Sequence, residues 1–285
     1  ADGGLAGELE RGRCPALDLY EDLTMALSPR IGEARFLGAV CARRGADSGH
    51  TRRMRRFYRA VRDIPFQVNV VPYCDFFHIG SSRELLNAFS SLSRTARQYA
   101  FANGSGASVT GDGGGAFVFN SCLKCPTGSV NALIEGVHAD RCRGLELKGE
   151  NILTGVPPEA TAPVSLAKGL GMVCLPVGKK GWAAVAYGLD DDFKTPFGGD
   201  KPCLFLNAPV EEWLAKSGIR ASRLWRADAA DGMWRARLWR VGAIDDVIAE
   251  AQAVVRGAGF ETRGRRYSLA ELIPMADHGR LLALR

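Results

Sequence analysis

The stretch from residue 117 to about residue 187 constrains the fold most, because it carries no helix-period pattern. Short apolar runs alternate there with glycine and asparagine, in the segments FVFN, ALIEGV, GLEL, NILTGV, GMVCLPV and WAAVAYG. Short apolar runs bounded by turn residues are typical of strands. A spacing of six recurs in patches, as in Leu133/Ala139/Leu145 and Leu147/Leu153. Hexapeptide periodicity marks a parallel β-helix, but this repeat is broken, so spacing alone leaves the sheet architecture open.

The C-terminal part of the chain carries helical patterns instead. An apolar stripe predicts a helix over Gly242–Gly257, and Gly257 stands where a C-cap would. A shorter helix is expected over Val210–Ala215. Ser268 and Glu271 have capping-box spacing, which predicts a further helix start. These elements have the character of scaffold.

Two more helices are expected near the N-terminus, over Ala16–Leu27 and over Thr51–Ile64, the second ending before Pro65. One side of the second helix is basic, with Arg52, Arg55, Arg56, Arg59 and Arg62. The net charge of +6 also favours phosphate-bearing partners, nucleic acid among them. A solvated face of an amphipathic helix explains the arginines equally well. No aromatic-basic signature of RNA binding accompanies them.

A strand running into a helix is predicted around Pro72–Leu86. Apolar and aromatic residues lie at strand density from Val68 to Phe77, and Gly80 then breaks the strand. Ser81 and Glu84 follow at capping-box spacing, so the Ser81 hydroxyl should accept from a backbone N–H and the Glu84 carboxylate should reach back to the Ser81 N–H. His78 and Ser82 stand at the same helix start. Free N–H groups and the helix dipole would make it an anion site, and a phosphate is the obvious ligand, although capping alone explains Ser81 and Glu84.

Gly188–Lys194, with the sequence GLDDDFK, is a second polar cluster. Its three consecutive aspartates, Asp190–Asp192, could hold Mg²⁺, which prefers carboxylate and phosphate oxygen. A solvated acidic turn is the alternative.

Several function classes are disfavoured by simple counts and motifs. No run of apolar residues is long enough for a transmembrane helix, and the N-terminus lacks the apolar core of a signal peptide. The eight cysteines are scattered through apolar surroundings, which favours a reducing, cytoplasmic location. Cys122 and Cys125 form a C-x-x-C without the second pair that a zinc site needs. The Gly-rich stretch Asn103–Gly115 is not followed by Gly-Lys-Ser/Thr, so a flexible connector is expected there rather than a P-loop.

The segment FFHIGSSRELL resembles the Phe-x-His-x-Gly-Thr-x-x-Glu-x-Leu segment of the L-fucokinase/GDP-fucose pyrophosphorylase family. The later segments FNSCL, LIEGV, NILTGVP, AYGLDDDFK, MWRARLWRV and YSLAELI follow in the family's order. The resemblance extends from about Leu17 to about Arg285. Two departures occur in MWRARLWRV, with Arg235 where asparagine is usual and Arg240 where proline is usual.

The resemblance implies both a fold and an activity. The implied fold is the end of an α/β nucleotidyltransferase-like domain over residues 1–102, a connector over 103–115, a parallel, left-handed β-helix over 116–209 and a helical extension over 210–285. The implied activity joins fucose 1-phosphate to GTP, with Mg²⁺, giving GDP-fucose and pyrophosphate. Many family members also carry a sugar kinase domain. The family's N-terminal Gly-rich nucleotide loop and its kinase loop have no counterpart in this sequence, so a fragment or a chain without turnover is expected.

Residue roles follow from the same resemblance. The helix start would hold the sugar phosphate through His78, Gly80, Ser81, Ser82 and Glu84. The cluster at GLDDDFK would contribute Asp191 and Lys194 to catalysis, while any metal ligands stay unknown.

Two other classes of function stay open. A β-helix scaffold or oligomerisation module without catalysis would give a concentration-dependent oligomer and no ligand response. An RNA-binding module would use the Arg-rich helix and the Trp/Arg stretch Ser222–Val241. Its binding would depend steeply on salt and would be lost on neutralising Arg55, Arg56 and Arg59. Neither a membrane nor nucleic acid is the expected partner.

Overall fold

The computed structural model describes residues 17–45, 47–72, 78–94, 106–110, 115–124, 131–225, 232–258 and 264–285. Contacts divide the chain into two compact units, Ala1–Asp75 and Phe76–Arg285. The four-part division expected from the sequence stays a prediction. Each unit is described by itself below.

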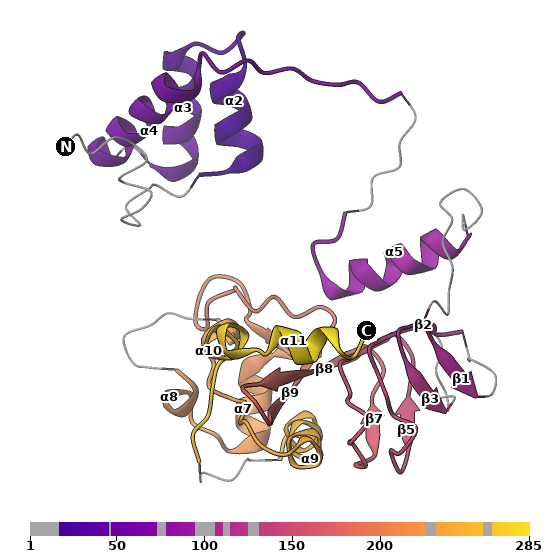
Figure 1. The fold of residues 1–285 in the computed structure, drawn as a ribbon. Helices are drawn as coiled ribbons and strands as arrows, with labels where there is room; N and C mark the ends of the chain where they lie inside the picture. The colour runs from indigo at the N-terminus through magenta and orange to yellow at the C-terminus, as the bar shows by residue number, and fades with distance from the viewer. Residues whose placement is uncertain are drawn as a thin grey trace. The chain divides into compact units, whose positions relative to one another are not determined.

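The first unit is helical (Figure 1). A π-helical turn, η1 (Leu19–Leu23), leads into α2 (Thr24–Leu27), and α3 (Glu33–Arg44) and α4 (Ser48–Val61) follow. The expected helices are therefore present, although α4 begins and ends three residues before the predicted bounds. Its core consists of Ala26, Phe36, Leu37, Val40, Met54, Phe57 and Tyr58.

The expected strand before Gly80 is not formed in the part that the structure describes. Residues 65–71 carry no strand assignment, and the exposed fractions are 74% for Val68 and 85% for Val70. A strand needs a hydrogen-bonded neighbour, and none of the described strands pairs with this segment. The rest of the predicted strand, residues 73–77, lies outside the described residues.

The second unit is built on a five-stranded sheet in the order β2-β4-β6-β8-β9. Its strands are β2 (Phe117–Phe119), β4 (Ala132–Glu135), β6 (Asn151–Thr154), β8 (Leu170–Val177) and β9 (Gly181–Gly188). The first four run parallel and β9 returns antiparallel along β8. This mainly parallel sheet, combined with helices, makes the fold mixed α/β.

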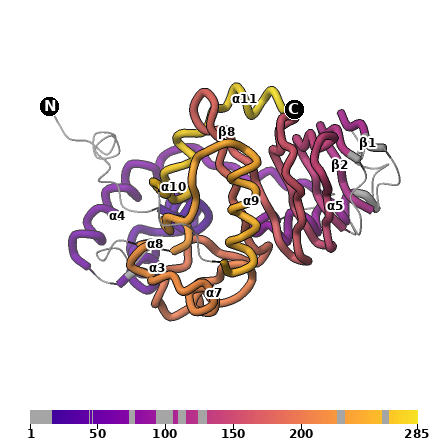
Figure 2. Tube along the Cα trace, turned by 90° about the horizontal axis from the view of Figure 1, so that it is seen from below, coloured from indigo at the N-terminus to yellow at the C-terminus, as the bar shows by residue number. Residues whose placement is uncertain are grey.

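Two smaller pairs of parallel strands are formed by the segments that connect the strands of the main sheet or precede them. They are β1 (Ser108–Thr110) with β3 (Cys122–Lys124), and β5 (Leu145–Leu147) with β7 (Val164–Leu166). Successive passes of the chain lie side by side from β1 and β2 toward β8 (Figure 2). The strand β1 corrects the expectation of an unstructured connector, because its Ser108 N–H donates to the Ser121 carbonyl at 2.7 Å.

Asparagine and glycine residues form the turns between successive parallel strands. The Asn151 side chain is fully buried; its Oδ1 accepts from Gly149 N–H, and its Nδ2 donates to the Ala167 and Leu170 carbonyls. Gly155 has φ +74°, and a Cβ there would lie 2.3 Å from the Cys174 carbonyl oxygen. The turn chemistry expected for these residues is confirmed.

Helices from the C-terminal third cover one part of this unit. They follow the short hairpin of β10 (Leu204–Phe205) and β11 (Ala208–Pro209). Helix α9 packs on β9, and Val247, Ile248 and Ala251 on its inner face join the main core. The expected cap at Gly257 is present, with φ +72°, and so is the capping box of Ser268 and Glu271. The helices are α7 (Val210–Ser217), α8 (Ala221–Leu224), η2 (Met233–Arg235), α9 (Ile244–Val255), α10 (Leu269–Leu272), η3 (Ile273–Met275) and α11 (His278–Leu282).

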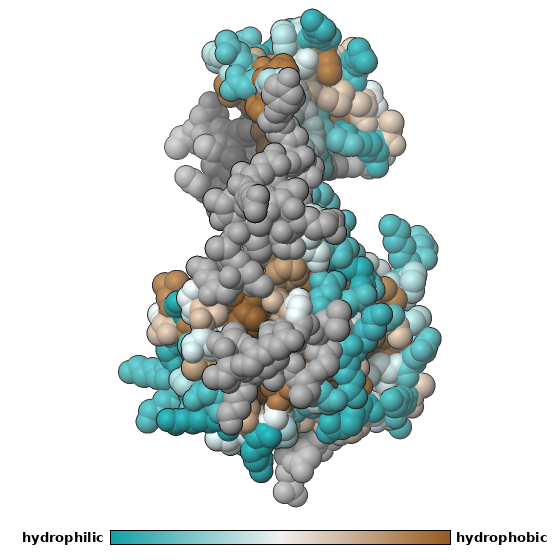
Figure 3. All heavy atoms as spheres, turned by 90° about the vertical axis from the view of Figure 1, so that its right-hand side faces the viewer, coloured by the Kyte–Doolittle hydropathy of each residue, from teal (hydrophilic) through white to brown (hydrophobic). Residues whose placement is uncertain are grey.

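Hydrophilic side chains cover most of the described surface on the face of this unit that Figure 3 shows, with apolar side chains in smaller groups. No described helix is long and apolar enough to cross a membrane.

Candidate functional site

The predicted helix after Gly80 is α5 (Ser82–Arg94), and it lies against the sheet of the second unit. Its buried residue Leu86 packs in a cluster with Phe117, Leu133 and Ile152 from β2, β4 and β6. Phe89 stacks near Phe117 and Phe119, with ring centroids 6.0 and 5.4 Å apart. This apolar contact positions the start of α5 at the edge of the sheet where the parallel strands begin.

The start of α5 is capped nearly as predicted. The Ser81 Oγ accepts from the Glu84 N–H at 3.1 Å. The Glu84 carboxylate reaches back one residue further than expected and accepts from the Gly80 N–H at 2.7 Å. The prediction for Ser81 is confirmed, and the partner predicted for Glu84 is corrected from Ser81 to Gly80.

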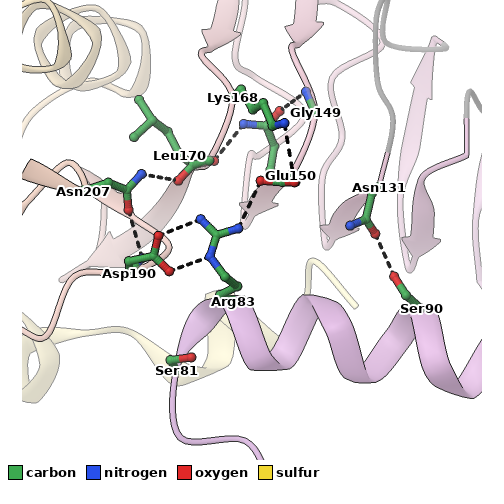
Figure 4. Close-up of polar contacts among 12 residues, drawn as sticks. Ser81, Arg83, Ser90, Asn131, Gly149, Glu150, Lys168, Leu170, Asp190 and Asn207 are labelled. Carbon is green, nitrogen blue, oxygen red and sulfur yellow. Dashed lines mark hydrogen bonds and ion pairs between the residues drawn. The ribbon is translucent and has the colours of Figure 1, made fainter.

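Arg83 joins α5 to the GLDDDFK cluster (Figure 4). Its guanidinium donates to both carboxylate oxygens of Asp190, at 2.5 and 2.7 Å, and to Glu150 at 3.0 Å. Lys168 lies 3.6 Å from the other oxygen of Glu150. The guanidinium holds the pKa of the Asp190 carboxyl below its usual range, chiefly through these hydrogen bonds. The structure therefore brings the two predicted clusters together through a residue that the sequence analysis passed over.

Two further contacts fix the same end of α5. The Arg83 N–H donates to the Leu189 carbonyl at 3.2 Å. The Ser82 side chain lies near the Tyr187 hydroxyl, whose pKa is raised by burial to about 12. Among the described residues, the N–H groups of Ser81 and Ser82 have no hydrogen-bond acceptor. Of the N–H groups at the start of α5, that of Arg83 is therefore bonded to the protein, and those of Ser81 and Ser82 are not.

His78 lies beside the start of α5. A Cβ on Gly80 would stand 2.7 Å from the His78 Nε2 and 3.1 Å from a Glu84 carboxylate oxygen, so both side chains lie close to the Gly80 backbone. His78 is exposed. The five predicted substrate residues, from His78 to Glu84, therefore share one small surface.

Asp191 braces the loop that precedes Lys194. Its carboxylate accepts N–H groups from Gly188, Leu206 and Asn207 at 2.7 to 2.9 Å. Burial raises the pKa of the Asp191 carboxyl, and the backbone donors act against that rise. The Lys194 side chain is exposed beyond this loop. Asp191 is thus placed to hold the loop that carries Lys194.

The three aspartates do not form a magnesium site in this geometry. The Asp190 oxygens are bonded to Arg83, the Asp191 oxygens to backbone N–H groups, and the Asp192 oxygens to Lys194 N–H and the Thr195 hydroxyl. Within the described part of the chain, no group of three or more His, Cys, Asp and Glu residues could hold a metal ion. Cys125 of the C-x-x-C pair lies outside the described residues.

The sequence analysis missed Arg83, Glu150 and Asn207. Asn207 accepts from the Asp190 N–H at 2.9 Å and donates to the Gly169 carbonyl at 2.9 Å. Charged residues flanking turns, such as Glu150 and Lys168, were the available signal. Only the register that stacks β6 on β8 places them beside Asp190.

Several residues of the basic helix and of the Trp/Arg stretch, which the RNA-binding hypothesis would use, make contacts within the protein. Arg55 and Arg59 form ion pairs with Glu33, at 2.9 Å each. Within Ser222–Val241, Trp225 and Trp239 are buried, and Trp225 donates its indole N–H to the Gly232 carbonyl, whereas Trp234 is exposed. These contacts are those of packing and helix–helix bracing.

The sequence is similar to proteins of known function. The sequence matches the family model described as "Fucose pyrophosphorylase domain" over residues 8–243. It is 31% identical over 161 residues to the L-fucokinase/L-fucose-1-P guanylyltransferase of Bacteroides fragilis. That alignment covers 56% of this chain and 16% of the relative, so the chain spans a small part of the relative's length. No solved structure matches.

Proposed function

Because the chain belongs to the fucose pyrophosphorylase family, we propose that it takes part in nucleotidyl transfer from GTP to L-fucose 1-phosphate. A phosphate oxygen of the sugar phosphate attacks the α-phosphorus of GTP, GDP-fucose forms and pyrophosphate leaves. The observation that carries this proposal is the match over residues 8–243, which includes both α5 and the loop of Asp190–Lys194. The name of the Bacteroides relative joins a kinase to a guanylyltransferase, so a covalent or associated kinase domain belongs to the proposal.

The start of α5 is proposed as the sugar-phosphate side of the site. The N–H groups of Ser81 and Ser82 lie at the positive end of the α5 dipole, and His78 adds a donor next to Gly80. Arg83 is committed to Asp190 and Glu150, so it positions the helix rather than binding the phosphate. Glu84 serves by holding the Gly80 N–H and fixing the turn.

Lys194 is proposed to stabilise developing negative charge on the nucleotide phosphates, because its side chain is exposed and forms no ion pair with a carboxylate among the described residues. Asp191 acts indirectly, by holding the loop that carries Lys194. Turnover is expected to require Mg²⁺, on the general chemistry of nucleoside triphosphates, with no ligand drawn from Asp190–Asp192.

The winding part of the second unit is proposed to be a left-handed parallel β-helix. Its support is the register, in which Leu133 pairs with Ile152 and Ile152 with Gly171, at the same interval along the chain. The pairs β1–β3 and β5–β7 supply strands on other sides of each pass. The antiparallel β9 would end the helix.

Calorimetric titration with fucose 1-phosphate, with GTP, and with both plus Mg²⁺ tests the proposed function, with pyrophosphate release followed in parallel. His78→Ala should weaken fucose 1-phosphate binding about tenfold, the loss of one hydrogen bond to a charged group. His278→Ala, at an exposed histidine of α11, is the matched control and should leave binding unchanged.

Three results would redirect the assignment. Absence of heat with either ligand, together with a concentration-dependent oligomer, would support the scaffold function. Steeply salt-dependent RNA binding that is lost when Arg55, Arg56 and Arg59 are neutralised would support the RNA-binding function. Equal losses in His78→Ala and His278→Ala would remove His78 from the site.

A further inference from the structure

We propose that a pocket beneath α11, separate from the site at α5, binds a small oxyanion, the phosphate or carboxylate group of a small molecule. The pocket has a volume of about 270 Å³. Its walls are the loop Pro157–Glu159, His138, Trp182, Arg280 of α11 and Leu284, which follows that helix. This volume suits a small metabolite rather than a dinucleotide.

The pocket lies at the opposite end of the sheet strands from α5. On the side of α5, Glu150 precedes β6 and Asp190 follows β9. On the side of the pocket, Pro157 follows β6 and Trp182 lies at the start of β9. Since β9 is eight residues long, the two places are separated by roughly 25 Å along the strand. A ligand of the α5 site therefore does not reach this pocket.

The walls are preformed, because the chain around α11 is pinned to the sheet. The Asp277 N–H donates to the Pro176 carbonyl at 2.8 Å, and Ala276 bridges to Val177. At the far end of the helix, the His138 Nε2 lies 3.0 Å from the Leu284 carbonyl oxygen. A pocket held in this way pays little ordering cost when a ligand enters.

Arg280 supplies the charge that favours an anion. Its guanidinium lies over the Trp182 ring, 4.4 Å from the centroid, and its Nη1 donates to the Gly178 and Gly181 carbonyls at 2.9 and 3.0 Å. Among the described residues, no carboxylate lies within ion-pair distance of Arg280, and its Nε and Nη2 have no acceptor. Arg285, by comparison, is paired with Glu135 at 2.7 Å. A half-buried guanidinium with unused donors is a ready partner for a bidentate oxyanion.

Two more polar groups limit the ligand. The Glu159 carboxylate accepts from the Trp182 indole N–H at 3.2 Å, and it opposes a second negative charge in the pocket. His138 keeps one ring nitrogen as a possible acceptor for a ligand hydroxyl, since the other faces the Leu284 carbonyl. Pro157, Pro158 and Leu284 give the remaining surface an apolar character. The ligand is thus a compact anion with a small apolar or hydroxylated body.

The indole N–H signal of Trp182 in a ¹H–¹⁵N spectrum reports on this pocket directly, and Trp182→Phe assigns it. Inorganic phosphate, fucose 1-phosphate and acetate are titrated separately into the whole chain. We expect a saturable shift of the Trp182 signal with at least one of them. A much tighter response to fucose 1-phosphate than to phosphate identifies an organic phosphomonoester as the ligand type, and equal responses identify a free anion.

Three variants make the test decisive. Arg280→Gln should weaken the response at least tenfold, and Arg285→Gln, at the neighbouring paired arginine, should leave it unchanged. Glu159→Gln keeps an acceptor for the Trp182 N–H while removing a negative charge, so it should tighten binding about fivefold. A gain of affinity cannot come from misfolding of α11. The proposal is overturned if no anion shifts the Trp182 signal, or if Arg280→Gln responds as the unchanged chain does.

Discussion

At the scale of single residues, Asp191 shows how a half-buried carboxylate can brace a loop. Burial favours its neutral form, and three backbone donors favour its charged form, so the two effects oppose each other in its pKa. The donors come from the chain on both sides of the turn, Gly188 and Leu206–Asn207. The carboxylate thereby ties the end of β9 to the β10–β11 hairpin. The loop that carries the exposed Lys194 is held in place as a result.

The ion pair between Arg83 and Asp190 should make stability depend on acidity. The pKa of Asp190 is lowered in the folded chain. The ion pair therefore stabilises the fold fully above the unfolded pKa of about 3.9, and this contribution is lost as the pH falls below that value through the lower folded pKa. Both side chains are partly exposed, at 33% and 45%, so we expect Arg83→Gln to cost only about 1 kcal/mol at pH 7. The cost should shrink below about pH 4.

Urea unfolding of the second unit at pH 7, 5, 4 and 3, followed by tryptophan fluorescence, measures this difference. Arg223→Gln, at an exposed arginine of α8, is the control and should show no pH-dependent difference. A cost for Arg83→Gln that stays constant across the pH series would mean that Arg83 acts through packing rather than through Asp190.

These residues also mark the limit of prediction from sequence. Ser81 and Glu84 could be predicted as a cap because capping is local, within four residues. Arg83 gave no such signal, since its partners are 67 and 107 residues away. The acidic run Asp190–Asp192 suggested a metal site because composition alone does not say where the backbone donors lie.

At the scale of elements, α5 is held on the sheet by a narrow apolar contact. Leu86 is 1% exposed and packs on Phe117, Leu133 and Ile152. Leu86→Ala should destabilise the second unit by roughly 2–4 kcal/mol, through lost burial and the cavity left behind. Urea unfolding by tryptophan fluorescence gives the value.

Asn87→Ala changes the next residue, which is exposed on α5, and should shift the midpoint by less than about 0.5 kcal/mol. If both variants unfolded at the midpoint of the unchanged chain, α5 would not contribute to the cooperative unit. Loss of fucose 1-phosphate binding in Leu86→Ala alone would then show that the docking of α5 matters for the site rather than for stability.

Helices proved easier to predict than strands for a physical reason. The apolar stripe of Ile244–Val255 is a local pattern that needs one neighbouring surface, here β9. A strand such as β6 needs partners on both sides, and its register depends on turns many residues away. The segment Val68–Val71 has the same composition as a strand, yet none of the described strands pairs with it and its valines remain exposed.

At the scale of the whole molecule, the two units differ greatly in the size of their cores. Among its described residues, the first unit buries seven apolar side chains between its helices, whereas the main core of the second extends from Ala116 to Leu284. Since a small core stabilises a domain weakly, the first unit should unfold at a lower urea concentration than the second. The chain as a whole should therefore not unfold in one step.

The positions of the tryptophans allow this to be measured without cutting the chain. All five, Trp182, Trp213, Trp225, Trp234 and Trp239, lie in the second unit, so fluorescence reports only on that unit. Far-ultraviolet circular dichroism also reports on the helices α2, α3 and α4 of the first unit. We expect circular dichroism to show an early transition that fluorescence lacks. Met54→Ala, at a fully buried residue of α4, should move only this early transition, and Arg53→Ala beside it should move neither. Coincident transitions in the unchanged chain, or a shift of the fluorescence midpoint by Met54→Ala, would show that the two units unfold as one.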